Sequence, residues 1–199
     1  MGEGCLIIAG LTVGKYASVC LIRDGVIELF LEEERLSRNK RDNNPFLCLI
    51  ELKKHIDRLD YLAISESNVR IEQFVLFAKK LGLIDTDDQV LTNNQPHETH
   101  HTFHAASGFY TSGFDEAVCV VIDNAGSQLN YNEIIGAEAE SILKFKYPAT
   151  CDIIYKKITN SLNNDPVVVG PYDIVGYYGI GKLYSSLTNH LGFGDGGAG

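Results

Sequence analysis

Hydrophobic and polar positions alternate in short runs at the start of the chain. Segment 5–10 is apolar, and 17–25 alternates apolar with polar residues before it ends in Asp24-Gly25. A period of two is typical of a half-buried strand, and Asp-Gly is a strong signal for a tight hairpin turn. Because the run 26–34 alternates in its turn, the pattern predicts three strands, with a hairpin between the second and third.

Helical spacing follows the hairpin. Apolar residues in 44–56 recur every three or four positions, and Pro45 stands where a first helical turn tolerates proline. A second such stretch, 69–82, ends at Gly82, and glycine favours helix C-termini. The pattern also predicts strands at 59–67 and 88–94 and a helix at 97–113 that Gly113 closes.

The second half of the chain begins in the same order as the first. Strands are predicted at 117–126, 133–147 and 151–158, and mostly helix at 171–191. Two meanders of three strands, each followed by helix, describe the α/β, duplicated ribonuclease-H-like fold of actin, heat-shock chaperones and sugar kinases, in which a nucleotide lies between the halves. We therefore expect a first subdomain at 1–114 and the start of a second, incomplete one at 115–199.

Composition narrows the range of partners. The chain is 45% hydrophobic and 22% charged, with a net charge of -9, so we expect no direct binding to a nucleic-acid duplex. No segment approaches the roughly 20 apolar residues of a membrane span, and the first residues lack the basic start of a signal peptide. The five cysteines form no CxxC pair, and we interpret them as reduced thiols. We therefore expect a cytoplasmic protein that binds no membrane.

Four of the six histidines fall within the segment 97–104. His100 and His104 are four residues apart, so a helix projects both imidazoles from one face, close enough to share a metal ion. His97 and His101 show the same spacing on another face. Spacing alone leaves open an exposed, polar helix start, because HxxxH lacks the glutamate of the zinc-protease motif HExxH.

Asp123 ends the apolar run of the strand predicted at 117–126. A carboxylate at the tip of a buried strand is costly unless it meets a cation or hydrogen-bond donors, and such strand ends line the ligand crevice of α/β folds. A turn of small residues follows, whose backbone N–H groups could face phosphate. An ordinary Asx turn is the alternative. The turn consists of Asn124, Ala125, Gly126 and Ser127.

Three separated segments match one family in order and at compatible spacing. Residues 100–123, HHTFHAASGFYTSGFDEAVCVVID, are similar to HHxxHAASAFYPSGFDEA…VVDG. Residues 23–42 resemble RDGxIVAAxEEERFSRxKHD, and residues 179–199 resemble SLGxLYxAVTxxLGFxxGxxG. These patterns belong to the O-carbamoyltransferases that act on antibiotics and nodulation factors, whose N-terminal module is Kae1-like.

The resemblance implies a metal-assisted transferase. In the family, a YrdC-like domain or chain makes carbamoyl-adenylate from carbamoyl phosphate and ATP. The Kae1-like module then passes the carbamoyl group to an acceptor hydroxyl of a sugar, an antibiotic or a nucleotide. A divalent metal, Fe²⁺ in the family, would lie on His100, His104 and Asp123 and act as a Lewis acid.

Other residues enter through the same resemblance. Ser18 and the turn 124–127 would contact the nucleotide, and Lys40, within the basic run 35–41, would supply charge to phosphate. A solvated helix end is the alternative for that run. The family reads HDAS where this chain has Lys15-Tyr16-Ala17-Ser18, so a catalytic role there would fall to Lys15, which acts as a base only with a lowered pKa.

Two further departures bear on the site. Arg41 replaces the histidine of SRxKHD, and Asn124 replaces the glycine of VVDG. An inactive or partner-dependent binding or scaffold fragment is therefore the second hypothesis. A phosphotransferase similar to sugar kinases is the third, but Leu11-Thr12-Val13-Gly14 stands where such a kinase has its DxG phosphate turn, and a kinase has no role for the histidine cluster.

Overall fold

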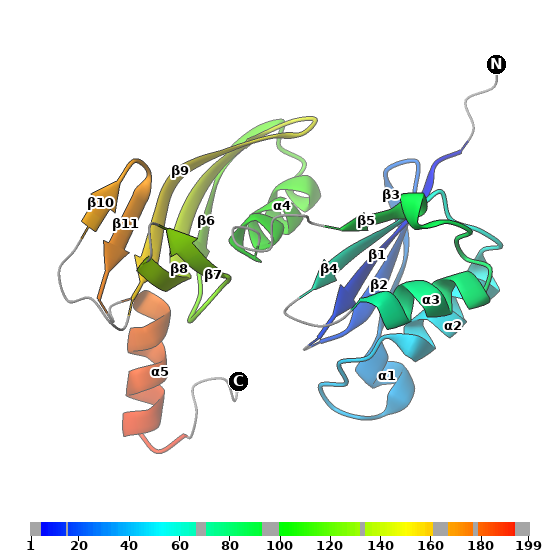
Figure 1. Ribbon diagram of the computed structural model, residues 1–199, viewed down its shortest axis with the longest axis horizontal. Coiled ribbons are helices and arrows are strands. Elements are labelled where there is room, and N and C mark those ends of the chain that lie inside the picture. The colour runs from blue at the N-terminus through cyan, green and yellow to red at the C-terminus, as the bar shows by residue number, and fades with distance from the viewer. Residues whose placement is uncertain are drawn as a thin grey trace. The chain divides into compact units, whose positions relative to one another are not determined.

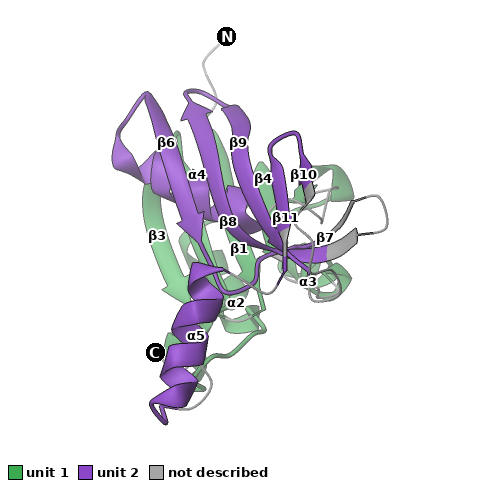
Figure 2. Cartoon of the chain, turned by 90° about the vertical axis from the view of Figure 1, so that its left-hand side faces the viewer, with its two compact units in different colours: residues 1–94 green, residues 95–199 purple. Residues whose placement is uncertain are grey.

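The chain folds as two compact α/β units, each with its own mixed sheet. The computed structural model describes residues 5–14, 16–66, 71–92, 100–131, 134–160, 167–176 and 179–193. The first unit covers residues 1–94 and the second covers 95–199 (Figures 1 and 2). The described residues contain five α-helices, none of them long and apolar enough to cross a membrane.

The first sheet has the strand order β3-β2-β1-β4-β5. Strand β2 pairs antiparallel with β1 and β3, while β4 runs parallel to β1 and β5 runs parallel to β4. The predicted hairpin is confirmed: Asp24 and Gly25 both have positive φ, 48° and 81°, as a tight hairpin turn of the favoured hand requires. The strands are β1 Ile7–Val13, β2 Ser18–Arg23, β3 Val26–Glu32, β4 Tyr61–Glu66 and β5 Val90–Thr92.

Two predicted strands of this unit have different bounds. The first strand was expected at 5–10, but β1 continues to Val13 because Leu11 and Val13 are buried in the core. The strand expected at 88–94 is shorter at its start, since Asp87–Gln89 forms a 3₁₀ turn that Thr86 and Gln89 close with a capping box. Residues 93 and 94 lie outside the described part of the chain.

Helices α2 Phe46–His55 and α3 Glu72–Lys80 bury their apolar faces in the first core, against β1, β2 and β4. Phe46 packs against Phe74 and Phe77 with ring centroids 5.0 and 5.1 Å apart. The short helix α1, Glu33–Ser37, replaces the end of the strand predicted at 26–34. Its first residue explains the change: the buried Glu33 carboxylate accepts hydrogen bonds from the N–H groups of Leu47 and Cys48 and so caps α2.

Cys48 should resist alkylation in the folded protein. Its thiol is fully buried and donates to the carbonyl of Leu31, and burial raises its pKa far above the ordinary value. We expect iodoacetamide to modify Cys48 on the order of 100-fold more slowly than the exposed Cys151, because reaction requires local opening. Mass spectrometry of alkylated peptides measures both rates, and similar rates for the two thiols would show that this core is not formed.

The second sheet has the order β10-β11-β9-β8-β6, with β7 paired to β8. The predicted strands at 133–147 and 151–158 are confirmed as the long antiparallel pair β8 and β9. Figure 2 shows β6, β8 and β9 side by side. The strands are β6 Glu116–Ile122, β7 Gln128–Tyr131, β8 Ile134–Lys146, β9 Thr150–Thr159, β10 Val167–Val169 and β11 Tyr172–Val175.

Helix α4, His100–Ser112, packs on β6 and β8. Phe109 is buried and stacks on Phe145 of β8 with ring centroids 5.3 Å apart, and Ala105 is buried in the same core. The boundary predicted at 114/115 leaves this helix with the first subdomain. The structure includes it in the second unit, because its apolar face forms the second core.

The end of the chain departs from the predicted helix at 171–191. Residues 172–175 form β11, parallel to β9, and the helix α5 begins only at Ile180 and ends at His190. Ile174 is buried in the sheet, which explains the extended backbone there. The short strands β7 and β10 were also missed, because three or four residues are too few to show a period.

Candidate metal centre

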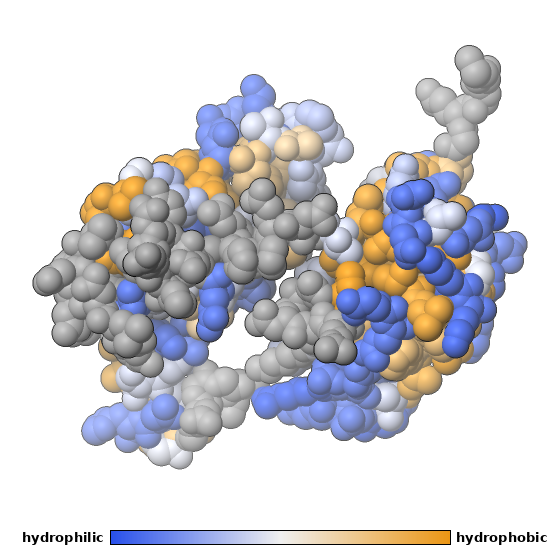
Figure 3. Space-filling model, in the orientation of Figure 1, coloured by the Kyte–Doolittle hydropathy of each residue, from blue (hydrophilic) through white to orange (hydrophobic). Residues whose placement is uncertain are grey.

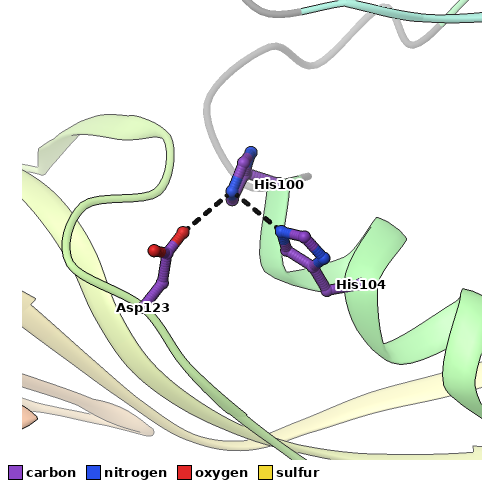
Figure 4. Close-up of side chains that lie close together, drawn as sticks. All are labelled: His100, His104 and Asp123. Carbon is purple, nitrogen blue, oxygen red and sulfur yellow. Dashed lines mark hydrogen bonds and ion pairs between the residues drawn. The ribbon is translucent and has the colours of Figure 1, made fainter. Parts of the chain in front are cut away.

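The structure brings the three predicted metal ligands together within the second unit. Helix α4 presents His100 and His104 one turn apart, and Asp123 is the first residue after β6 (Figure 4). His100 Nε2 lies 2.9 Å from Asp123 Oδ2 and 3.1 Å from His104 Nε2. One ligand atom from each residue lies within 4.8 Å of the others.

This donor set fits a divalent ion. Two atoms that each lie about 2.1 Å from a tetrahedrally bound metal are about 3.4 Å apart, close to the two separations seen here. Two imidazole nitrogens and one carboxylate oxygen are ligands that Zn²⁺ and Fe²⁺ accept. Figure 4 shows the side chains of His104 and Asp123 both directed at His100, so small side-chain movements would bring the three donors around one ion.

The electrostatics of the pair His100–Asp123 favour a cation at this point. The hydrogen bond from the imidazole lowers the pKa of Asp123 to about 2, so the carboxylate is charged across the physiological range. The same contact raises the pKa of His100. A metal would take the place of the proton that the carboxylate now attracts to His100, because both cations need the same nitrogen lone pair.

A pocket of about 500 Å³ opens beside the three side chains. His104 and Asp123 lie on its wall, and Ala105 and Gly108 of α4 leave it room because their side chains are small or absent. Residues 119–122 of β6 complete the lining. The side chains of His100 and Asp123 are 38% and 32% exposed, so a ligand in the pocket has access to the donor atoms.

Comparison with known proteins shows which family the chain belongs to. Residues 74–197, more than half of the chain, match the family model described as carbamoyltransferase N-terminus. This chain belongs to the carbamoyltransferase family. It is 26% identical over 146 residues to sll1178, an uncharacterized protein of Synechocystis sp.. That alignment covers 55% of the carbamoyltransferase chain and 24% of sll1178, so the chain spans about a quarter of the relative's length.

The turn after β6 is held by the protein's own acceptors. Asn124 N–H donates to Asp123 Oδ1 at 2.6 Å. An Asx turn, the alternative that the sequence left open, would instead use the N–H two residues after the aspartate. The N–H groups of Gly126 and Ser127 donate to Glu138, one to its carbonyl and the other to its carboxylate. Three N–H groups of the turn 124–127 thus donate hydrogen bonds to acceptors of the same chain.

Helix α5 begins against the same turn. A Cβ on Gly181 would lie 2.3 Å from the carbonyl oxygen of Asp123, so only glycine lets the helix come this close. The N–H of Ile180 donates to Glu140, and Ser185 donates to the side-chain oxygen of Asn124. The segment 179–193, which holds most of the third family motif, therefore touches the turn next to Asp123.

The remaining predicted site residues belong to the first unit or lie outside the description. Ser18 begins β2, opposite Thr12 and Glu32, and Lys40 is exposed in the loop after α1. Lys15 and His97 lie outside the described residues. The expected grouping of Ser18 and Lys40 with the turn 124–127 joins two separate units and stays a prediction.

The sequence did not indicate a group of buried polar residues behind the three candidate ligands. Glu138 and Ser141 of β8, Lys156 of β9 and His101 of α4 are fully buried. Burial lowers the pKa of His101, which favours its neutral form. The acidic and basic residues of β8 and β9 resemble those of any half-exposed strand. Strict alternation counted back from the buried residues Phe145, Leu143 and Ser141 would place Glu138 on the outer face. A register shift between Glu138 and Glu140 turns it inward, and the sequence carries no signal for that shift.

Proposed function

We propose that this carbamoyltransferase chain holds the metal of an O-carbamoyl transfer module. The observation that carries the proposal is the meeting of His100, His104 and Asp123 at the wall of a pocket, inside the segment that matches the family. The reaction we infer passes a carbamoyl group from carbamoyl-adenylate to an acceptor hydroxyl. An O–C bond forms, the bond to the adenylate phosphate breaks, and AMP and the hydroxyl proton are released. The adenylate would come from carbamoyl phosphate and ATP on a YrdC-like domain or chain.

The chain's own residues prepare the site for that reaction. His100 and His104 supply nitrogen donors, and Asp123 supplies negative charge. The hydrogen bond between His100 Nε2 and Asp123 holds the ring toward the carboxylate until a metal takes the place of the shared proton. A bound metal, which we propose is Fe²⁺, contributes Lewis acidity toward a carbonyl or phosphoryl oxygen. The adjoining pocket has the size of a small-molecule site, so a sugar, antibiotic or nucleotide hydroxyl is the acceptor class we infer.

The sheet topology supports the finer fold proposal, a duplicated ribonuclease-H-like architecture. Strands β6, β8 and β9 repeat the antiparallel meander of β1, β2 and β3. In the first sheet, β1 also pairs with the parallel strand β4, whereas β6 pairs only with β8 among the described strands. We propose that a strand equivalent to β4 pairs along β6.

Apolar side chains at the surface fit this proposal. Figure 3 shows hydrophobic residues at the surface of both units. On β6 they follow one face: Val118, Val120 and Ile122 are 58%, 63% and 51% exposed. Helix α5 likewise has no buried residue and exposes Leu183, Tyr184 and Leu187. Apolar faces of this kind are normally covered by another element or chain.

A second candidate function is a binding or scaffold role without catalysis. The observation that favours it is the segment Lys15-Tyr16, which stands where the family has a histidine and an aspartate. Without those two residues, positioning or proton transfer in the first unit would have to be supplied by other groups.

A transfer assay separates the two functions. The purified chain is mixed with Fe²⁺ and with carbamoyl-adenylate, which is supplied chemically or made in place by a YrdC-like enzyme from labelled carbamoyl phosphate and ATP. We expect label to enter a sugar, nucleoside or antibiotic acceptor, and a chelator to stop it, because the metal is needed for polarisation. Binding of metal with no transfer to any acceptor would favour the scaffold role. Absence of metal binding would contradict the proposed metal centre.

A further inference from the structure

A buried carboxylate lies directly behind the candidate metal centre and takes no part in the proposed reaction. Glu138 of β8 is fully buried, as are its neighbours His101, Ser141 and Lys156. Burying a polar group is costly unless it is hydrogen-bonded, and burying a charge is costlier still, so four buried polar residues in one place, two of them charged, require an explanation. The contacts of Glu138 provide one.

Glu138 joins the two backbone segments that carry the metal ligands. Its Oε2 accepts hydrogen bonds from the N–H of Ser127 at 3.1 Å and from the N–H of His101 at 3.4 Å. His101 follows the ligand His100 in α4, and Ser127 ends the turn that begins at the ligand Asp123. One carboxylate oxygen therefore connects the start of α4 to the turn after β6.

Further contacts strengthen this connection. The hydroxyl of Ser127 accepts a hydrogen bond from the N–H of His100 at 3.2 Å. The backbone of Glu138 is paired with the same turn, since its carbonyl accepts from Gly126 and its N–H donates to the carbonyl of Ser127. The position of the turn relative to the helix is thus determined by hydrogen bonds to two residues, Ser127 and Glu138.

Lys156 supplies the compensating charge. Its ammonium forms an ion pair with Glu138 Oε1, and both side chains are completely buried. A charge pair in this position does not stabilise a fold better than well-packed apolar residues would. What an apolar residue could not do is accept hydrogen bonds from two backbone segments at once.

Packing around Gly126 shows how closely the parts fit. A Cβ on Gly126 would lie 2.9 Å from Glu138 Oε2 and 2.9 Å from Nε2 of His101. His101 is fixed from its other side, where Nδ1 lies 2.7 Å from the hydroxyl of Ser141, and its buried Nε2 has no hydrogen-bond partner in the described structure. The backbone at Gly126 therefore packs directly against the His101 imidazole and the Glu138 carboxylate, and a side chain at position 126 would have no room.

We propose that Glu138, paired with Lys156, is a positioning residue of the metal centre. By holding the start of α4 against the turn 124–127, it sets the spacing of His100, His104 and Asp123. The proposal deepens the proposed function and rests on it for the presence of a metal. The hydrogen-bonded link itself is a property of the chain that can be tested without any metal.

Two double variants test the link without leaving a charge buried. The variant E138L/K156M removes both charges and the acceptor atoms. The variant E138Q/K156M removes both charges but retains a side-chain oxygen that can accept from His101 and Ser127. Co²⁺ is the probe, because its visible absorption bands report the number and geometry of its ligands. The matched control is E116Q/K144M, which removes an exposed ion pair between β6 and β8 of the same sheet.

We expect E138L/K156M to bind Co²⁺ about 10–100-fold more weakly than wild type, the range seen when outer hydrogen-bond partners of metal ligands are lost. E138Q/K156M should recover most of the affinity and the wild-type absorption bands, which a purely structural loss of stability would not do. The control should behave as wild type. Equal Co²⁺ affinity in wild type and E138L/K156M would overturn the positioning role while leaving the metal centre intact.

Amide hydrogen exchange provides the readout that does not depend on metal. In wild type the N–H groups of His101 and Ser127 should be protected, in E138L/K156M they should exchange at least about 10-fold faster, and in E138Q/K156M protection should return. If wild type binds no Co²⁺ but shows this exchange pattern, the proposed function fails and the link stands. Unchanged exchange in E138L/K156M would refute the link.

Discussion

Replacing His104 by alanine is expected to abolish stoichiometric binding of divalent metal to this chain. The three donors lie within 4.8 Å of one another, and removal of His104 leaves one imidazole and one carboxylate, which are too few to hold an ion tightly. The loss of affinity should exceed the roughly 10–100-fold cost of losing an outer partner of a ligand. Metal analysis of tag-free protein after dialysis against Fe²⁺ or Zn²⁺ gives the stoichiometry directly.

His190→Ala is the matched control for that experiment, because His190 is an exposed histidine at the end of α5. It should retain the metal content of wild type. The measurement should be made at a pH above the ordinary imidazole pKa of about 6.5. The hydrogen bond to Asp123 raises the pKa of His100, so protons compete with metal up to a higher pH here than at an isolated histidine. Equal metal content in wild type and His104→Ala would refute the ligand assignment.

Lys156→Met on its own should be strongly destabilising. It removes the cation that compensates a carboxylate buried at 0% exposure. Breaking a buried ion pair from one side typically costs about 3–5 kcal/mol, whereas replacing both partners is often close to neutral. We therefore expect the free energy of unfolding of the second unit to fall by that amount in Lys156→Met, and the double variant E138L/K156M to recover much of the loss.

Urea denaturation followed by amide exchange in β8 and β9 measures this effect in the unit that contains the pair. The control is Lys144→Met, which breaks the exposed pair with Glu116 and should change the free energy of unfolding by less than about 1 kcal/mol. If Lys156→Met cost no more than Lys144→Met, the ion pair between Lys156 and Glu138 would not stabilise this unit, and it could not be part of the link.

Local patterns were sufficient where an element depends on its own residues. The hairpin at Asp24-Gly25 was predictable because the turn needs positive φ at two positions, and the strands β8 and β9 because their alternation is long. The helical spacing of His100 and His104 placed both imidazoles on one face, whatever the helix packs against. These features follow from backbone geometry, which neighbouring residues in the chain already determine.

Other features depend on residues far apart in sequence. Helix α1 forms because Glu33 turns inward to cap α2, and β11 forms because β9 offers it a parallel partner. The boundary between the units depends on which sheet α4 packs against, and the apolar pattern of α4 does not show which sheet that is. A period in the sequence predicts that an element has an apolar face but not which surface covers it.

By itself, the sequence determined the family, the candidate ligands and most of the elements, because motif spacing and hydrophobic period are local properties of the chain. The tertiary structure alone decided that Asp123 meets His100 across 23 positions and that Glu138 and Lys156 are buried behind them. The sequence pattern around a charged strand residue is the same whether its face of the sheet is exposed to solvent or covered by another element. Its role is determined only when α4 and the turn after β6 close over it, because burial makes an unpaired charge costly and so selects its partners.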